Sequence, residues 1–359
     1  MDSSSRNTSS YVVNLVFLSL IIAAFVYLYI SSPSVSNPLL SYRHDNSCRH
    51  SQSVTFSLDE LEMALQKASM PNKTVIIAVL NKAYVEPSVK SETTMLDLFL
   101  ESFWYGEDTR SLLDHLLVVA VDQTAYDRCK FKRLNCYKLE TQGVDFTGEK
   151  LFMSQDFIKM MWRRTLLLLD VLKHGYNFIF TDSDVMWLRN PFPKLSNNQS
   201  IDLQISTDWF NGDPLSERNF INTGFYYVRS NNKTIALFDA WYSRKDNSTG
   251  KKEQDVLLDL VREGALRKLG INARFLDTVF FSGFCADSKD ITAVSTVHAN
   301  CCRSISAKVL DLRSVLRDWM RFKADQSRIK KNHNDTNPTL SFRWSGHFGC
   351  WRSWNNTSV

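Results

Sequence analysis

The sequence predicts an α/β fold in which helices cover both faces of a mostly parallel sheet. Three continuous apolar runs support this fold: "TVIIAVL" (74–80), "LLVVAVD" (116–122) and "FIF" (178–180). Strands buried on both faces have this composition, whereas strands with one solvated face alternate. Segments of helical pattern, 94–106 and 154–175, lie between the runs. Strands alternating with helices are typical of a parallel sheet.

Capping patterns place two of the helices. In "SLDELEMALQKA", Ser57 followed three residues later by Glu60 predicts a helix with a capping box. The segment 154–175 is bounded more fully: Ser154 can cap it, Asp156 lies in its first turn, Lys173 and His174 in its last, and Gly175 ends it.

A third helix follows from apolar spacing alone. The residues Val309, Leu312, Leu316 and Trp319 recur at helical intervals, which predicts a face packed on the core. The sequence turns polar after about residue 325. We therefore expect one domain over 56–325 and a C-terminal segment over 326–359 whose aromatic end packs back.

The chain of 359 residues begins with a membrane-anchor pattern. Tyr11 to Ile30 has no charged residue and is long enough to cross a bilayer as a helix. A cleaved signal peptide is the alternative, although its apolar region is usually shorter. We expect a cytosolic tail at 1–10, a single span at 11–30 and a Ser- and Pro-rich stem at 31–55.

Sequons and cysteines favour a lumenal body. Seven Asn-x-Ser/Thr sequons follow the predicted span, and they are useful only in the secretory lumen. They lie at Asn72, Asn198, Asn232, Asn247, Asn334, Asn355 and Asn356. Seven cysteines are an odd number, so some should pair and one should remain. Cys129 and Cys136 are the easiest pair to join, and a zinc site around "HANCC" (His298, Cys301, Cys302) is a less favoured alternative.

Two carboxylates mark the expected ligand site. Asp182 and Asp184 directly follow the apolar run 178–180, and ligands of parallel sheets bind beyond the carboxyl ends of the strands. Thr181 and Ser183 add further oxygen atoms, and such hard donors suit Mg²⁺ or Mn²⁺. A bare Asp-x-Asp is common in turns, so its position after a buried strand carries this prediction.

Four motifs in order extend this prediction to a family. "GYNFIFTDSDVMWLRNPF", "FINTGFYYVRSN", "EQDVL" and "TVHANCC" resemble the plant nucleotide-diphospho-sugar transferases grouped in glycosyltransferase family 77. The resemblance covers about residues 70–325. It implies a GT-A fold, a UDP-sugar donor, a divalent metal (Mn²⁺ or Mg²⁺) and retention of anomeric configuration. It also implies a single-pass type II protein of the Golgi membrane.

The resemblance assigns the metal and nucleotide residues. Asp182 and Asp184 resemble the donor-binding motif, with Asp184 as the more direct metal ligand and Asp182 nearer the ribose. His298 stands where such enzymes often supply a further metal ligand, and Asn81 is similar to residues lining the nucleotide pocket. The alternatives are a structural histidine and a turn at the end of the strand. Arg164 either reaches the phosphates or is a solvated helix residue.

The same comparison assigns residues near the sugar. Asn222, Thr223 and Gly224 resemble the strand that faces the sugar, although a glycine there can also mark a bulge. Gln254 and Asp255 open a predicted helix, where both can be caps. We expect Asp255 to lie near the anomeric carbon. Trp187, Trp209 and Trp241 could stack on sugar rings, but most of them are expected in the core.

These observations predict an enzyme that transfers a sugar. The resembled family implies a pentose, arabinose or xylose, moved to a cell-wall glycoprotein or polysaccharide acceptor. A non-catalytic scaffold of a Golgi complex is the alternative, and it would not need intact metal ligands. A phosphoesterase would need more carboxylate and histidine ligands. The net charge of only +5 without a dense basic block argues against a nucleic-acid partner.

Overall fold

A computed structural model of the chain describes most residues after 58, together with a short segment near the amino terminus. The described ranges are 18–24, 59–87, 92–140, 146–150, 153–331 and 343–354, with only the backbone described at 329–331. The chain divides into two units, Met1–Phe56 and Ser57–Val359. The second unit contains all the strands described below.

The predicted membrane span lies largely outside the described ranges. Residues 18–24 form a short helix. Within the ranges given above, no helix combines the length and the apolar composition needed to cross a bilayer. The span at 11–30, the stem at 31–55 and the cytosolic tail at 1–10 therefore stay predictions.

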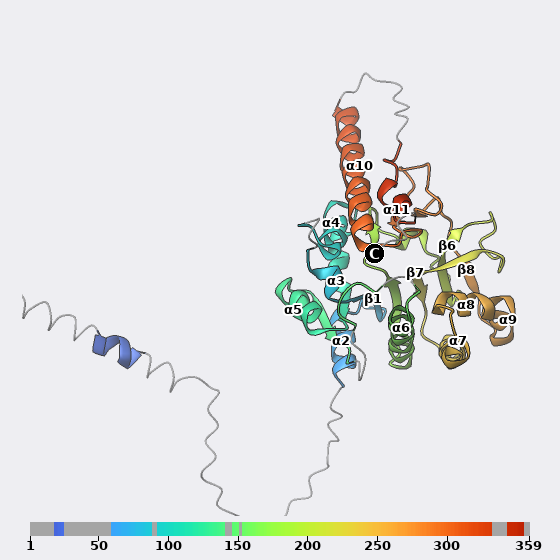
Figure 1. Cartoon of the computed structure of the whole chain (residues 1–359), viewed down its shortest axis with the longest axis horizontal. Coiled ribbons are helices and arrows are strands. Elements are labelled where there is room, and N and C mark those ends of the chain that lie inside the picture. Colours follow the sequence, from blue (N-terminus) through green and yellow to red (C-terminus); the bar gives the residue numbers. More distant parts are fainter. Residues whose placement is uncertain are drawn as a thin grey trace, which may run out of the picture. The chain divides into compact units, whose positions relative to one another are not determined.

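A seven-stranded sheet forms the centre of the second unit, as the apolar runs predicted (Figure 1). Its strand order is β3-β2-β1-β4-β7-β6-β8. The strands are β1 (Thr74–Leu80), β2 (Leu116–Ala120), β3 (Asn135–Lys138), β4 (Asn177–Thr181), β6 (Leu203–Trp209), β7 (Phe220–Val228) and β8 (Ala273–Phe275). Neighbouring strands are parallel except that β7 runs antiparallel to both β4 and β6. The sheet is therefore mostly parallel.

A second, three-stranded sheet lies beside the end of β4. It consists of β5 (Val185–Trp187), β10 (Thr296–His298) and β9 (Phe281–Gly283). The strand β10 pairs antiparallel with β5 and parallel with β9. Because only three residues separate β4 from β5, this sheet joins the end of β4 to a segment more than a hundred residues later in the chain.

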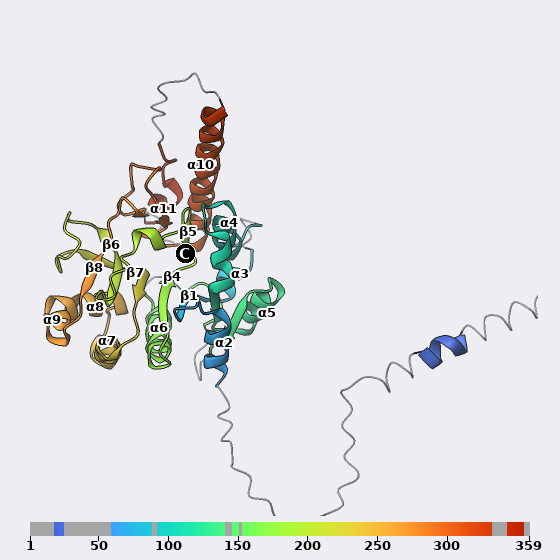
Figure 2. The same cartoon turned by 180° about the vertical axis from the view of Figure 1, so that it is seen from behind.

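Helices cover both faces of the large sheet. One face packs on α2 (Glu60–Ala68), α6 (Gln155–Lys173), α7 (Asn232–Ser243), α8 (Glu253–Arg262) and α9 (Ala265–Leu269). The other packs on α4 (Met95–Tyr105), α5 (Gln123–Phe131), α10 (Ile305–Lys331) and the small sheet. Seen from behind, α10 and α11 (Phe348–Arg352) again stand together, away from α6 and α7 (Figure 2). The short helix α3 (Lys82–Val85) and three 3-10 helices, Arg110–His115, Phe192–Lys194 and Lys245–Asn247, complete the described elements.

The capping predictions are confirmed for α6 and corrected for α2. The hydroxyl of Ser154 accepts a hydrogen bond from the Phe157 amide, as expected for an N-cap, and Gly175 follows the helix with a positive φ of 78°. In α2 the cap is Asp59, whose carboxylate accepts from the Glu62 amide at 2.6 Å. Ser57 is two residues too early, because the helix begins at Glu60.

The predicted core face of α10 is confirmed. Val309, Leu312, Leu316 and Trp319 are all buried against the sheet. The helix continues to Lys331, beyond the change to polar composition at about residue 325.

Six of the seven cysteines form disulfides. Cys129 pairs with Cys136 as predicted, and the others pair as Cys285–Cys301 and Cys302–Cys350. The zinc alternative is wrong, because the cysteines it needs are all joined to each other. Cys48 lies outside the described residues. Of the sequons, Asn72, Asn198, Asn232 and Asn247 are exposed, and the other three lie outside the described ranges.

Candidate active site

A cavity of about 290 Å³ opens where the carboxyl ends of β1, β4 and β6 meet. Its lining includes nine of the ten residues that the sequence singled out for the site. They are Asn81, Arg164, Asp182, Asp184, Asn222, Thr223, Gly224, Gln254 and His298. The cavity lies in the second unit alone.

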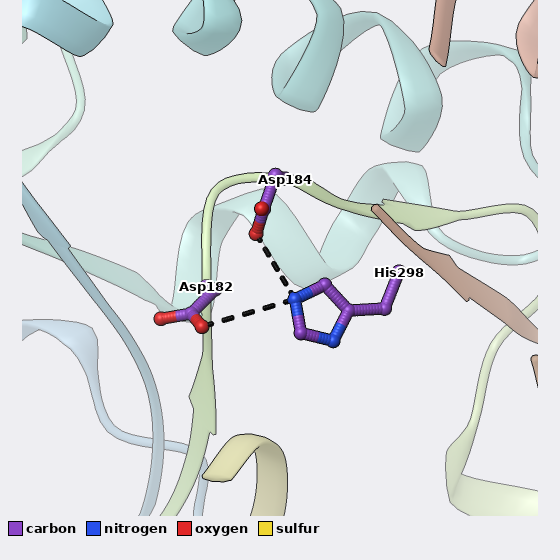
Figure 3. Close-up of side chains that lie close together, drawn as sticks. All are labelled: Asp182, Asp184 and His298. Carbon is purple, nitrogen blue, oxygen red and sulfur yellow. Dashed lines mark ion pairs between the residues drawn. The ribbon is translucent and has the colours of Figure 1, made fainter. Parts of the chain in front are cut away.

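The turn from β4 to β5 brings the predicted metal ligands together. Asp182 and Asp184 occupy this turn, and the pairing of β5 with β10 sets His298 opposite Val185. The amide of Ala299 donates to the Asp184 carbonyl at 3.0 Å, which extends the pairing by one residue. His298 Nε2 lies 3.3 Å from Asp184 Oδ1 and 3.9 Å from Asp182 Oδ2, so both carboxylates face the imidazole (Figure 3).

The pKa values of the two carboxylates are shifted in opposite directions. Burial, reinforced by the charge on Asp184 although opposed by Arg164, raises the pKa of Asp182 to about 6. Burial also raises the pKa of Asp184, but Lys308 and His298 outweigh it and lower that pKa below its ordinary value. Asp184 is thus held ionised, and its charge disfavours ionisation of Asp182 beside it. A divalent cation bound between the two carboxylates would relieve their mutual repulsion.

Lys308 was missed by the sequence prediction. It comes from the first turn of α10 and lies 2.6 Å from Asp184 Oδ2, with its side chain mostly buried. Burial lowers the pKa of Lys308, but Asp184 overrides that effect and raises it, so the amine is charged. Lys308 lies four residues before Leu312, on the apolar face of the helix. A lysine on a predicted core face was the signal that could have found it.

Arg164 links the aspartates to α8. It is 4% exposed, and its guanidinium binds Asp182 Oδ1 at 2.9 Å and Glu253 Oε1 at 2.6 Å. The alternative of a solvated helix charge is therefore wrong, and contact of Arg164 with the phosphates stays a prediction. Its neighbour Arg163 points elsewhere and donates to the Glu140 carbonyl at 2.9 Å. Glu253 is 2% exposed, and among the described residues its Oε2 has no hydrogen-bond partner.

A bulge in β7 forms the floor of the cavity. Ile205 of β6 pairs with Tyr226, but the next residue, Ser206, pairs with Asn222, so 223–225 have no partner on β6. The Thr223 amide, freed in this way, donates to Gln254 Oε1 at 3.0 Å. On the other side of β7 the pairing with β4 continues, since the Gly224 carbonyl accepts from the Asp182 amide at 2.7 Å.

Gly224 is required by close packing. A Cβ atom there would lie 2.9 Å from both Asn222 Oδ1 and Asp182 Oδ2 and would overlap the His298 ring. Gly224 thus lies in a bulge, the alternative considered above, and that it faces the sugar stays a prediction.

Asn81 fixes a more apolar end of the cavity. It follows β1, and its amide nitrogen donates to the Phe146 and Gly148 carbonyls at 2.8 and 2.9 Å. This orientation leaves Oδ1 buried without a hydrogen-bond partner among the described residues. The lining of the cavity also contains apolar and aromatic side chains, namely Val79, Tyr84, Phe157, Met160 and Met161.

The C-terminal segment forms part of the cavity wall. Trp354 lines the cavity and donates from Nε1 to the Cys301 carbonyl at 2.7 Å. The guanidinium of Arg303, another lining residue, stacks over the Trp354 ring at 4.3 Å. The disulfide Cys302–Cys350 ties this segment to the loop after β10. The sequence indicated that the tail packs back, but not that it lines the site.

Asp255 is not brought to the cavity. Glu253 and Gln254 line it, whereas the Asp255 carboxylate turns back and accepts from the Lys252 amide at 3.2 Å. The structure thus gives Asp255 a capping contact, the alternative considered above. Its role near the anomeric carbon stays a prediction. Trp187 and Trp241 are core residues, and Trp209 is 64% exposed.

Comparison with known proteins agrees with this geometry. Residues 111–312 match the family model described as nucleotide-diphospho-sugar transferase. This range is more than half of the chain, which therefore belongs to the nucleotide-diphospho-sugar transferase family and is a glycosyltransferase. Its mostly parallel α/β sheet agrees with the fold class that the sequence predicted.

Three relatives from Arabidopsis thaliana illustrate the range of similarity. An uncharacterised protein is 57% identical over 322 residues, covering 89% of this chain and 92% of the relative. Beta-arabinofuranosyltransferase RAY1 is 27% identical over 62% of this chain and 41% of its own length. UDP-D-xylose:L-fucose alpha-1,3-D-xylosyltransferase 3 is 26% identical over 54% of this chain and 49% of its own length.

Proposed function

We propose that this glycosyltransferase is metal-dependent and retaining, and that it moves a pentose from a UDP-sugar to a cell-wall glycan or glycoprotein. The observation that carries the proposal is the Asp182, Asp184 and His298 cluster at the carboxyl end of β4. One ligand atom from each residue lies within 4.8 Å of the others. The scaffold alternative is less favoured, because it gives no reason to keep this cluster.

The residues present fit a hard divalent cation. Asp182 and Asp184 supply oxygen donors and His298 a nitrogen donor, a set that Mn²⁺ accepts more readily than Mg²⁺ does. When bound, the metal supplies Lewis-acid stabilisation of the charge that develops on the departing diphosphate. Three protein ligands leave coordination positions for phosphate oxygens.

The other lining residues include two cations and an uncharged region, each suited to a different part of the donor. Lys308 places a buried ammonium beside Asp184, where it can bind a phosphate oxygen directly. Arg164 holds Asp182 and Glu253 in fixed orientations and so positions the donor motif. Asn81 and the apolar residues around it offer a surface for the nucleoside. Preorganised charges of this kind need no rearrangement during the reaction.

The bulge of β7 supplies the groups nearest the proposed sugar position. The Gln254 carbonyl oxygen accepts from the Thr223 amide and hydroxyl, at 3.0 and 3.2 Å. Its amide N–H groups, which have no hydrogen-bond partner among the described residues, can donate to the sugar. Asn222 and Gly224 provide a flat surface against which a sugar ring can approach Asp182.

The pentose and the compartment rest on indirect support. The names of the relatives include an arabinofuranosyltransferase and UDP-xylose-dependent enzymes. The three disulfides and the exposed sequons suit an oxidising lumen. Together with the apolar segment 11–30 they support a type II protein of the Golgi membrane.

Donor binding by the full chain in detergent tests the proposal. We expect Mn²⁺-dependent binding of one UDP-pentose from a panel of UDP-sugars, measured by calorimetry. We expect the same binding to be lost in Asp184→Asn. The control Asp213→Asn removes an exposed charge outside the cavity and should bind normally. The anomeric configuration of the product then reports retention, and a folded chain that binds no UDP-sugar contradicts the proposal.

A further inference from the structure

The cavity extends past the metal cluster to the end of β6, where Asp208 lines it. Asp208 is the extra residue of an irregularity in β6. Thr207 pairs with Ile221 and Trp209 pairs with Phe220, which leaves Asp208 without an opposite residue. Such bulges redirect a side chain, and they are frequent beside active sites.

Two asparagines hold the Asp208 carboxylate by one oxygen. Asn222 Nδ2 and Asn300 Nδ2 both donate to Asp208 Oδ1, at 2.8 and 2.7 Å. The second oxygen, Oδ2, has no hydrogen-bond partner among the described residues. A carboxylate fixed on one side in this way presents its other oxygen to the cavity as an acceptor.

The orientation of both asparagines is itself fixed. Asn222 Oδ1 accepts from the Gly224 amide at 2.8 Å, and Asn300 Oδ1 accepts from the Cys285 amide at 3.1 Å. Neither side-chain amide can flip without losing a hydrogen bond. The carboxylate is therefore held from β7 and from the loop after β10 at once, which is more than a solvated aspartate requires.

The order of the strands places Asp208 relative to the proposed positions of the nucleoside, the metal and the sugar. Along the sheet edge the lining residues run from Asn81 after β1, through Asp182 after β4 and Asn222 on β7, to Asp208 on β6. Neighbouring strands are about 4.8 Å apart, so Asp208 lies roughly 14 Å from the β1 end. If the nucleoside is near β1, the metal and diphosphate are near β4, and the transferred sugar is near β7.

We propose that Asp208 binds the acceptor, with Oδ2 accepting a hydrogen bond from a hydroxyl group of an acceptor sugar. This inference rests on the proposed function, because the nucleoside and the metal set the direction along the sheet. The next position beyond the transferred sugar is β6. A carboxylate there selects a neutral, hydroxyl-bearing ligand and repels an acidic one. Trp209, the next residue, is 64% exposed and offers an open ring beside it.

Exchange of one oxygen for nitrogen tests this role with little structural change. In Asp208→Asn the remaining carbonyl oxygen can still accept from Asn222 and Asn300. Only the free atom changes, from an acceptor to a donor. Asp213→Asn is the matched control, because it makes the same exchange on the same hairpin at an exposed site outside the lining.

The experiment uses the full chain in detergent with Mn²⁺ and UDP. The acceptor probes are the methyl glycosides of arabinofuranose, xylose, galactose and fucose, followed by saturation-transfer NMR. We expect at least one glycoside to bind the wild type and its affinity to fall about tenfold or more in Asp208→Asn. Affinity for UDP should stay within about twofold, and the unfolding midpoint within about 3 °C, of the wild type.

Other results overturn the inference in distinguishable ways. Unchanged glycoside affinity in Asp208→Asn, or no glycoside bound by a wild type that binds UDP, removes Asp208 from the acceptor site. A tenfold loss of UDP affinity in Asp208→Asn assigns Asp208 to the donor site. Binding of an unglycosylated hydroxyproline peptide with no glycoside bound makes the acceptor a protein. A wild type that binds neither UDP nor any UDP-sugar overturns the proposed function and this inference with it.

Discussion

Arg164 joins the cavity to the core with a single side chain. Its guanidinium is enclosed by Asp182, Glu253 and the ring of Phe180, whose centroid is 4.5 Å away. Burial opposes its charge, but the two carboxylates outweigh burial and raise the pKa of Arg164. The residue is therefore a fixed cation that can orient Asp182 without titrating.

Removal of this guanidinium should destabilise the protein strongly. In Arg164→Met the carboxylate of Glu253, 2% exposed, is left without its cation, and such losses cost about 3–5 kcal/mol. Urea unfolding measures the loss. Arg163→Met is the matched control, because that side chain makes one hydrogen bond to a backbone carbonyl, and it should cost about 1 kcal/mol or less. Equal losses in the two variants would contradict the role given to Arg164.

At the residue scale, chemical type at a strand end was enough to find the two aspartates of the cluster. Asp182 and Asp184 could be predicted because a buried strand precedes them, and His298 because a resemblance placed it. Asp208 could not be found, because the asparagines that orient its carboxylate, Asn222 and Asn300, are 14 and 92 residues away in the sequence. Asp255 shows how much the position on a helix matters. A one-residue step on a helix turns a side chain by about 100°, so Gln254 faces the cavity and Asp255 does not.

The bulge in β7 is the element that determines the shape of the site. It separates 223–225 from β6 and leaves the Thr223 amide to donate to Gln254. A run such as "FINTGFYYV" predicts a strand, as found, but three residues without a partner on β6 leave no mark in the apolar pattern beyond Gly224.

A methyl group at Gly224 should therefore disrupt the site and leave the fold intact. Gly224→Ala places a carbon 2.9 Å from Asp182 Oδ2 and against the His298 ring, so the metal ligands must move. We expect Mn²⁺ affinity, measured by calorimetry, to fall at least tenfold while the circular dichroism spectrum is unchanged. Unaltered Mn²⁺ affinity would mean that Asp182, Asp184 and His298 do not bind the metal.

A histidine links the end of α6 to the start of α2, and its contribution to the stability of the folded protein depends on pH. His174 Nδ1 lies 2.8 Å from the Asp170 carbonyl oxygen and Nε2 lies 3.0 Å from Asp59 Oδ2. Burial lowers the pKa of His174, but these two contacts raise it overall, and the Glu62 amide and His174 lower the pKa of Asp59. The stabilisation from His174 is thus complete below its unfolded pKa of about 6.5 and is lost as pH rises through the folded pKa.

His174→Gln should accordingly destabilise the protein at about pH 5.5 and much less at about pH 8.5, as measured by urea unfolding at both values. The contribution of Asp59 has the opposite sign, since a lowered pKa stabilises above about pH 4 and is lost in acid. Lys173→Gln is the control, because a lysine does not titrate between these values. A His174→Gln effect that is the same at both pH values would contradict the tie.

At the scale of the whole molecule, the site is assembled from both ends of the second unit. Asn81 comes from the first strand and Trp354 from the last described segment. The order of apolar runs predicted the sheet, because each strand reports its own burial. It did not predict that α10 and the C-terminal segment close the cavity, since no local pattern encodes which distant elements meet.

The disulfide Cys302–Cys350 should matter for binding as well as for stability. It spans 48 residues, for which removal costs about 2–5 kcal/mol, and it anchors the wall that contains Trp354. We expect the double variant Cys302→Ser, Cys350→Ser to bind UDP-sugars more weakly, as measured by calorimetry at a temperature where it is folded. The pair Cys129→Ser, Cys136→Ser is the control, because that disulfide spans only 7 residues and lies outside the lining. Equal UDP-sugar affinity in both variants would contradict a role for the C-terminal wall.

The position of the Cys302–Cys350 wall, His298 and Lys308 late in the sequence also sets the order in which the parts of the molecule can fold during synthesis. The four strands β3, β2, β1 and β4 are complete once residue 181 has left the ribosome, and they can associate before the rest exists. His298, Lys308 and Trp354 emerge last, which at ordinary translation rates adds roughly ten seconds or more. Until then the aspartates lack their histidine, their lysine and the far wall. A nascent chain therefore has a framework long before it has a site, so sugar nucleotides cannot assist the early steps of its folding.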